Sequence, residues 1–203
     1  MNSISVNLGF VPSYRTLFTK SFTTWCERMR SECIRTIEKI PGVNLVIPMP
    51  APDGSEKVDA IQGFSPFGAV TNLNQADAVA DYFQSKKVDG IIIGAIDFGD
   101  ERSAAKIAER LKVPILLFAT KEPDAPDDPS LARVSDSYCG TLTISAALHR
   151  RNLPFVFAGV VYPDEKSFQN SISIFARSVA VTKALKNARI GQIGERPEPF
   201  ESM

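Results

Sequence analysis

The residues best suited to bind a small polar ligand lie near the ends of predicted strands and helices. Arg15 follows the first predicted strand, and Asp97 follows the third. Asp136, Ser137 and Tyr138 come directly before and at the start of a predicted helix. Together they offer a guanidinium, two carboxylates and two hydroxyl groups, the mixed donors and acceptors that the hydroxyls of a neutral polyol require. We expect these five residues to form a substrate-binding set.

A purely structural role is the alternative for the same residues. Asp97, Asp136 and Ser137 are residue types that cap helices and loops through side-chain hydrogen bonds. Arg15 and Tyr138 are of types that also pack on protein surfaces. The sequence leaves both interpretations open.

Catalytic and metal-binding groups are not expected in this chain. Its single histidine, His149, precedes two arginines at the predicted end of a helix, where the helix dipole favours positive charge. A metal site needs a cluster of His, Cys, Asp or Glu, and we predict none. The sequence also lacks a P-loop and a G-x-G-x-x-G fingerprint after its first strand.

The stretch around residues 91–93 predicts the centre of the fold. Its three isoleucines form a continuous apolar run, which is typical of a parallel strand covered on both faces. Gly94 and Gly99 end the strand and shape the loop after it. Asp100 then stands where the N-cap of the next helix is expected. Ligands of open α/β sheets bind at this carboxyl edge.

Strand and helix patterns alternate five times along the chain, which predicts an α/β fold with a parallel sheet. The strands are expected at 3–10, with Pro12 as a breaker after the first, at 44–47, around 91–93, at 113–119 and at 154–160. The helices are expected from 13 to 40, from a cap at Asn74 to about 83, from a cap at Asp100 to 111, from 136 to 151, and from a cap at Asp164 to about 185. The simplest arrangement is a doubly wound three-layer sandwich. We predict a flavodoxin-like five-stranded parallel sheet in the order 2-1-3-4-5.

A further short strand is predicted at 188–194, after the fifth helix. It needs a partner, and only nine residues follow it. We therefore predict a first domain over 1–187 and the start of a second, truncated domain over 188–203.

The amino-acid composition narrows the classes of binding partner that we expect for this protein. Lys and Arg together equal Asp and Glu at 23 each, which gives no electrostatic reason to expect nucleic acid or an anionic membrane surface. No apolar stretch approaches membrane-spanning length, and the N-terminus lacks the pattern of a signal peptide. The three cysteines include no Cys-x-x-Cys pair, so we expect free thiols in a reducing cytoplasm.

Several short motifs occur in an order that resembles a known family. They are Val-Asp-Gly-Ile-Ile at 88–92, Asp-Ser-Tyr-Cys-Gly at 136–140 with Ala-Ala-Leu at 146–148, Leu-Pro-Phe at 153–155, and Arg-Ile-Gly-Gln-Ile-Gly-Glu-Arg-Pro at 189–197 with Phe200. In order and spacing they resemble the N-terminal domain of the L-fucose isomerase/L-arabinose isomerase family. The resemblance covers almost the whole chain.

This resemblance implies an aldose–ketose isomerase that acts through an enediol on a sugar. Manganese or another divalent metal would polarise the sugar oxygens in the full-length enzyme. The metal ligands and acid–base residues belong to later domains, so this chain would bind no metal and be inactive alone. The resemblance also implies a homo-oligomer, a trimer or hexamer, in which this domain lends residues to a neighbour's sugar pocket. Arg15 would correspond to a sugar-contacting arginine.

Two other functions remain open on the sequence. One is a stand-alone flavodoxin-like module that binds a sugar or a protein partner without catalysis. The other is a flavin-binding electron carrier, which the fold would also accommodate. Both predict ligand binding by this chain alone.

Overall fold

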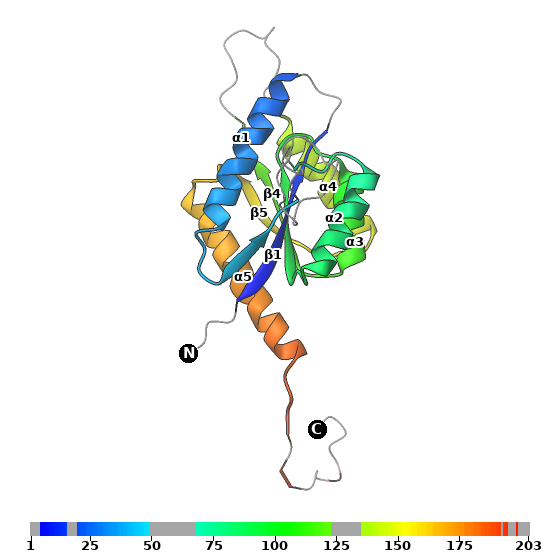
Figure 1. Ribbon diagram of the computed structural model, residues 1–203, viewed down its shortest axis with the longest axis vertical. Helices are drawn as coiled ribbons and strands as arrows, with labels where there is room; N and C mark the ends of the chain where they lie inside the picture. Colours follow the sequence, from blue (N-terminus) through cyan, green and yellow to red (C-terminus); the bar gives the residue numbers. More distant parts are fainter. Residues whose placement is uncertain are drawn as a thin grey trace, which may run out of the picture.

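Five parallel strands form one sheet at the centre of the molecule (Figure 1). The computed structural model describes residues 5–15, 20–48, 68–122, 135–191, 193, 194 and 198, with the backbone alone at 20–24. The strands are β1 (Val6–Ser13), β2 (Val43–Val46), β3 (Gly90–Ala95), β4 (Ile115–Thr120) and β5 (Val156–Val161). Their order is β2-β1-β3-β4-β5, which confirms the predicted flavodoxin-like order.

Five helices cover the two faces of this sheet. They are α1 (Lys20–Ile37), α2 (Leu73–Ser85), α3 (Glu101–Leu111), α4 (Ser137–Arg150) and α5 (Lys166–Lys186). Helices α1 and α5 share one hydrophobic core with the sheet, and α2, α3 and α4 share the other. The predicted three-layer sandwich is confirmed (Figure 1).

Strand β3 is buried on both faces, as its apolar run predicts. Ile92 packs in the core under α1 and α5, whereas Ile91 and Ile93 pack in the core under the other three helices. All six residues of β3 are buried. A central strand with no solvent-facing side leaves polar groups only at the two edges where the strands end.

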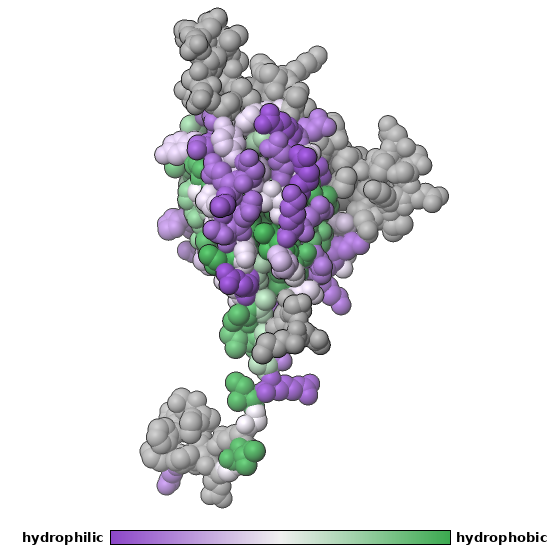
Figure 2. Space-filling model, turned by 90° about the vertical axis from the view of Figure 1, so that its left-hand side faces the viewer, coloured by the Kyte–Doolittle hydropathy of each residue, from purple (hydrophilic) through white to green (hydrophobic). Residues whose placement is uncertain are grey.

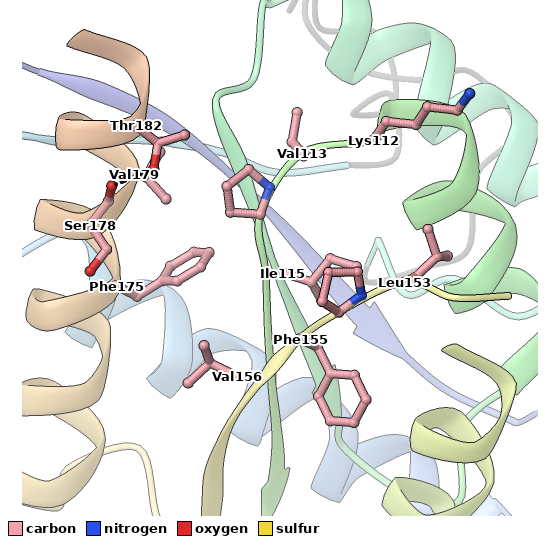
Figure 3. A pocket seen from close by; sticks show the side chains of 12 residues that line it. Lys112, Val113, Ile115, Leu153, Phe155, Val156, Phe175, Ser178, Val179 and Thr182 are labelled. Carbon is pink, nitrogen blue, oxygen red and sulfur yellow. Dashed lines mark hydrogen bonds between the residues drawn. The ribbon is translucent and has the colours of Figure 1, made fainter. Parts of the chain in front are cut away.

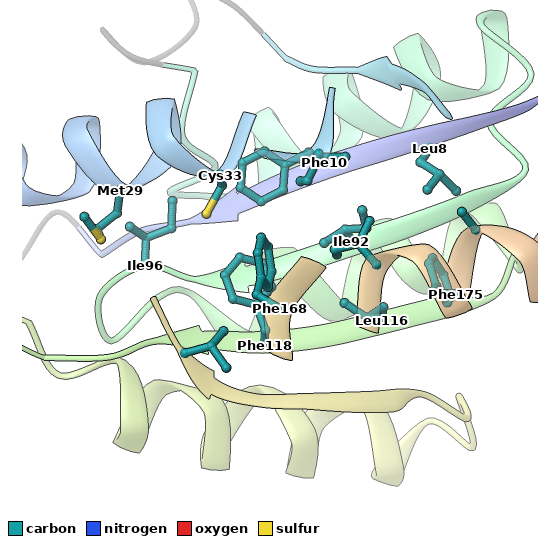
Figure 4. Packing of buried hydrophobic residues seen from close by; sticks show 14 of the residues in the cluster. Leu8, Phe10, Met29, Cys33, Ile92, Ile96, Leu116, Phe118, Phe168 and Phe175 are labelled. Carbon is teal, nitrogen blue, oxygen red and sulfur yellow. The ribbon is translucent and has the colours of Figure 1, made fainter. Parts of the chain in front are cut away.

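Aromatic rings fill the core on the α1 and α5 side (Figure 4). The Phe118 ring lies between Phe10 and Phe168, with centroid distances of 6.3 and 4.8 Å. Met29 and Cys33 bring the apolar stripe of α1 onto the same cluster. Removing such rings from water is the main stabilising contribution in this layer.

Strand β1 runs past the point where the sequence predicts its end. Pro12 was expected to break the strand, but its backbone continues to Ser13. β2 pairs with β1 only up to Gly9, and beyond it Val70 takes the neighbouring position and donates its N–H to the Pro12 carbonyl at 2.8 Å. A proline is tolerated here because no ladder bond requires its missing N–H.

Two helix starts differ from the sequence prediction. Helix α2 is capped by Asn72 instead of Asn74, and the Asn72 side chain accepts from the Gln75 N–H at 3.0 Å. Gln75 reaches back to the N–H of Thr71 at 2.7 Å, so the two side chains form a reciprocal cap. Helix α5 begins one residue later than predicted, with Glu165 as its N-cap residue.

The strand predicted at 188–194 is wrong for the residues that the structure describes there. Residues 188–191, 193 and 194 belong to no strand. Ile190 is 95% exposed and Ile193 fully exposed, so neither packs on the sheet. The boundary at 187 and the second domain beyond it stay a prediction.

The outer surface is polar over much of its area. Figure 2 shows the side on which α1 and the first turns of α5 lie, where hydrophilic residues dominate the body of the molecule. Among the described helices, none combines the length and the apolar character that crossing a bilayer requires.

Gly9 provides a test of the packing between β1 and α2. A Cβ added there would lie 2.5 Å from the buried Phe83 ring, so Gly9→Ala should lower the free energy of unfolding by about 1–3 kcal/mol. Urea denaturation measures this change. Gly191→Ala, whose Cβ meets nothing within 4 Å, is the control and should be neutral. Equal stability of the Gly9 variant and wild type would contradict this packing.

Candidate substrate-binding edge

The carboxyl ends of β1 and β3 meet at the switch point of the sheet. These strands are neighbours, yet the chain leaves β1 towards α1 on one face and leaves β3 towards α3 on the other. Diverging connections of this kind create a crevice where ligands of doubly wound sheets bind. Arg15 and Asp97 follow these two strands and contact each other here.

Asp97 joins the two loops through its buried carboxylate. It accepts from the backbone N–H of Arg15 at 3.1 Å and from that of Gly99 at 2.7 Å. Burial raises the pKa of the Asp97 carboxyl to about 7, although the hydrogen bonds from Gly99 and Arg15 and the positive charge of Arg15 oppose the shift. The group therefore changes charge near neutral pH.

The loop after β3 fixes the orientation of the Arg15 side chain. Its Nε donates to the Gly99 carbonyl at 2.8 Å, and its guanidinium pairs with Glu101 at 2.6 Å. The guanidinium also lies 4.1 Å from the centre of the Phe98 ring. The side chain stays 26% exposed, so these contacts orient a cation at the surface of the edge.

The loop between β3 and α3 is fixed by its own caps. Asp100 accepts from the backbone N–H groups of Arg102 and Ser103 at 3.0 and 3.2 Å, which confirms the predicted N-cap. Its own N–H donates to the hydroxyl of Ser13 at 3.0 Å. Gly99 adopts a φ of +71° in this turn, a conformation that glycine accommodates without strain.

Ser137 ties the start of α4 to the ends of β3 and β4. Its hydroxyl donates to the carbonyl of Thr120. The hydroxyl of Ser135 donates to the Ile96 carbonyl at 3.2 Å and accepts from the Ser137 N–H at 3.2 Å. The first turn of α4 is therefore anchored to the same edge as Asp97.

Gly140 allows α4 to approach the loop after β3 closely. A Cβ at this position would lie 2.1 Å from the Phe98 carbonyl oxygen and 2.8 Å from that of Asp97. Only a residue without a side chain permits this backbone contact. The structure thus brings Arg15, Asp97 and Ser137 to one place, which we call the switch-point rim.

Asp136 and Tyr138, the other two predicted site residues, lie beside this rim and differ in their contacts. Asp136 occupies the N-cap position of α4 but makes no side-chain cap hydrogen bond, so the structure does not support the alternative role of a helix cap for this residue. The Ser135 hydroxyl binds the Ser137 N–H instead. Tyr138 is 60% exposed, in keeping with a surface position. A substrate-binding role for all five residues stays a prediction.

Three polar residues at this edge escaped the sequence analysis. Ser13 and Glu101 anchor the loop and Arg15, and Arg30 lies buried on α1. Glu101 could have been inferred from its place in the first turn of a predicted helix. Nothing in the spacing of Ser13 or Arg30 distinguishes them from neighbouring polar residues.

A cavity at the opposite end of the sheet does not suit a sugar. It has a volume of about 480 Å³ and lies between β5 and α5, with Phe155, Val156, Phe175 and Val179 among its lining residues (Figure 3). Apolar walls offer few partners for hydroxyl groups. The polar switch-point rim is therefore a better candidate for sugar binding than this apolar cavity.

Metal ligands do not gather in the part of the chain that the structure describes. No three His, Cys, Asp or Glu side chains there lie close enough to share an ion. Cys26 and Cys33 are buried, and burial raises the pKa of both thiols. The described residues therefore do not fit a divalent metal.

Comparison with known proteins assigns the chain to a family. A family model for the N-terminal domain of fucose/sulfoquinovose isomerases matches residues 9–186. The chain belongs to this family. The assignment confirms the resemblance of its motifs and relates the chain to sugar isomerases.

Individual relatives agree with this assignment. Sulfoquinovose isomerases of Priestia aryabhattai and Priestia megaterium are each 27% identical over 136 residues, which is 67% of this chain and 29% of each relative. The chain thus spans less than a third of their length. A ribose-phosphate pyrophosphokinase of Bacillus caldolyticus is 35% identical over 74 residues, or 36% of this chain and 22% of the relative.

The raised pKa of Asp97 predicts a pH-dependent stability. Its folded pKa of about 7 lies above the unfolded value of about 4, so its contribution is complete below pH 4 and is lost as the pH rises towards 7. Stability should fall over this window by up to about 4 kcal/mol more in wild type than in Asp97→Asn. Urea unfolding at several pH values gives both curves. Parallel curves would contradict a buried Asp97 with a raised pKa.

Proposed function

We propose that this chain is the N-terminal substrate-rim and oligomerisation domain of a metal-dependent aldose–ketose isomerase. The reaction would interconvert an aldose and a ketose through an enediol. The family match over residues 9–186 supports the reaction class. The observation that carries the assignment to a binding edge is the meeting of Arg15, Asp97 and Ser137 at the switch point.

Arg15 is proposed to contact the sugar directly. Its guanidinium is partly exposed yet held by Phe98, Gly99 and Glu101, so a hydroxyl could be bound with little loss of side-chain freedom. Asp97 is a positioning residue, because its carboxylate holds the backbone of Arg15 and is itself buried. Both roles concern binding and orientation of the sugar.

The acid–base chemistry is proposed to come from elsewhere in the enzyme. A divalent metal, expected to be manganese, would polarise the carbonyl and hydroxyl oxygens of the sugar. The described residues do not fit such an ion. We therefore assign no proton transfer to this domain and expect the metal site to be built by other domains.

A homo-oligomer is proposed as the working form. The group of the rim that titrates near neutral pH, Asp97, is buried, so we propose that the rim contributes to catalysis by facing acid–base groups of another site, on its own subunit or a neighbouring one. The relatives named as sulfoquinovose isomerases suggest a sulfonated sugar, and the family description also includes fucose. The substrate is thus proposed to be a hexose or deoxyhexose of one of these classes.

The alternative is a stand-alone module that binds a sugar or a protein without catalysis. It is favoured by one observation, the complete sheet with both hydrophobic cores closed by this chain's own helices. Calorimetry with L-fucose, L-arabinose and sulfoquinovose separates the two. Tight binding by this chain alone would favour the module over the isomerase domain.

The Arg15 assignment predicts a kinetic effect in the enzyme that contains this domain. Arg15→Met should lower kcat/KM for the sugar by roughly 10- to 100-fold, mainly through KM, because a charge-assisted hydrogen bond is lost. Conversion followed by ¹³C NMR with manganese present provides the rates. Arg102→Met removes a more exposed arginine of the same edge and should leave kcat/KM unchanged.

The same assay shows whether this domain can convert a sugar without the other domains. The 203-residue chain alone should convert no sugar with manganese, whereas the enzyme containing it should. Turnover by this chain alone would contradict its role as a rim domain. Wild-type kinetics of the Arg15 variant would remove Arg15 from the sugar site.

A further inference from the structure

Arg30 is a buried cation that has no ion-pair partner in the part of the chain that the structure describes, although the negative charge of Glu27 on the same helix favours its charged form. It lies on α1 with 7% of its surface exposed, and its Nε and one Nη are enclosed without a hydrogen-bond acceptor. Among the described residues, no carboxylate forms an ion pair with it. Its neighbours on α1 differ, since Arg28 pairs with Glu32 at 3.0 Å.

The surroundings of Arg30 place it at the carboxyl edge of the sheet. A Cβ added to Gly68 would lie 3.0 Å from its Nη2 and 2.0 Å from the Pro48 carbonyl oxygen. Pro48 follows β2, and Gly68 precedes the Val70 bridge beside the end of β1. The guanidinium therefore lies against backbone on the β2 side of the β1 end.

The switch-point rim lies on the other side of the β1 end. Cys26 is one helical turn before Arg30, and the charge of Asp97 contributes to the raised pKa of its thiol. One turn of α1 thus separates the surroundings of Asp97 from Arg30. Both lie at the carboxyl edge of the sheet, on opposite sides of the β1 end.

An enclosed guanidinium without an acceptor is unfavourable and calls for an explanation. Burial lowers the pKa of Arg30, yet a guanidinium stays protonated in proteins, so its charge persists. A planar fork of N–H donors matches the oxygens of sulfonate and phosphate in a bidentate geometry. A neutral polyol would supply hydroxyl acceptors but leave the charge uncompensated.

We propose that Arg30 is an anion-binding residue of this domain and takes a tetrahedral oxyanion, the sulfonate or phosphate group of an acidic sugar. This inference rests on the proposed function and specifies its substrate class. Arg15 and Arg30 then divide the ligand, with hydroxyl groups at the switch-point rim and the anionic group on the β2 side. Arg30 is a binding residue and takes no part in proton transfer.

Anion titrations of the purified protein test this inference. Trp25, the single tryptophan, lies on the same helix and reports through its fluorescence. Methanesulfonate and inorganic phosphate are titrated separately at constant ionic strength, with chloride as the reference salt. We expect a saturable response to at least one of them, and the stronger responder shows which oxyanion the site prefers.

Variants on α1 separate Arg30 from general charge effects. Arg30→Met should weaken the response by at least about tenfold, and Arg35→Met, which removes an exposed arginine from the last turn of the same helix, should leave it unchanged. Arg30→Lys keeps the charge without the planar fork and should bind with intermediate strength. Urea unfolding checks the fold, and Arg30→Met should be at least as stable as wild type because an unpaired buried charge is removed.

Two results would overturn the inference. One is a wild-type protein that gives no saturable response to either anion up to about 50 mM. The other is an equal response of wild type and Arg30→Met or, should Arg30→Met not fold, of wild type and Arg30→Lys. Because the readout needs no turnover, failure here leaves an isomerase of neutral sugars intact. If the protein binds an anion but shows no isomerase activity, either alone or as part of a longer enzyme, only the proposed function is contradicted.

Discussion

The buried carboxylate of Asp97 is the interaction on which the candidate site depends. Two chain segments leave the sheet in opposite directions at the switch point, and this one side chain accepts backbone hydrogen bonds from both. Arg15 then has a fixed starting point, and Phe98 and Glu101 direct its guanidinium. This carboxylate acts together with other polar contacts between the two segments, which are those of Arg15 with Gly99 and Glu101 and that of the Ser13 hydroxyl with the Asp100 N–H.

The layered fold explains why buried charge gathers at this edge. Helices cover both faces of the sheet, so its interior accepts only apolar side chains such as those of β3. Buried charged groups therefore lie near the ends of the strands, where Asp97 and Arg30 are found on either side of the β1 end. Each is costly to bury, and the two large apolar cores offset that cost. Unfavourable burial maintained in this way is typical of binding sites.

The sequence predicts the fold well because hydrophobic periodicity and strand order follow from burial alone. The apolar run at 91–93 and the cap at Asp100 are local patterns, and the structure confirms both. It predicts the site only in part. The contact between Arg15 and Asp97 follows from strand order, whereas the burial of Arg30 depends on packing between distant segments. The cap of α2 is at Asn72 and not at Asn74, because two nearby asparagines offer equally good local patterns. The strand predicted at 188–194 is wrong for the described residues, because a local apolar pattern does not show whether a partner strand is present.

A direct measurement of the Asp97 carboxyl tests the central claim that this group is buried and joins the two loops. The ¹³C resonance of its carboxyl carbon, followed by NMR between pH 3 and 9, reports its protonation. We expect a midpoint near pH 7, with the backbone amide signals of Arg15 and Gly99 shifting at the same midpoint. A midpoint near the ordinary value of about 4, with both amide signals unaffected, would contradict the account.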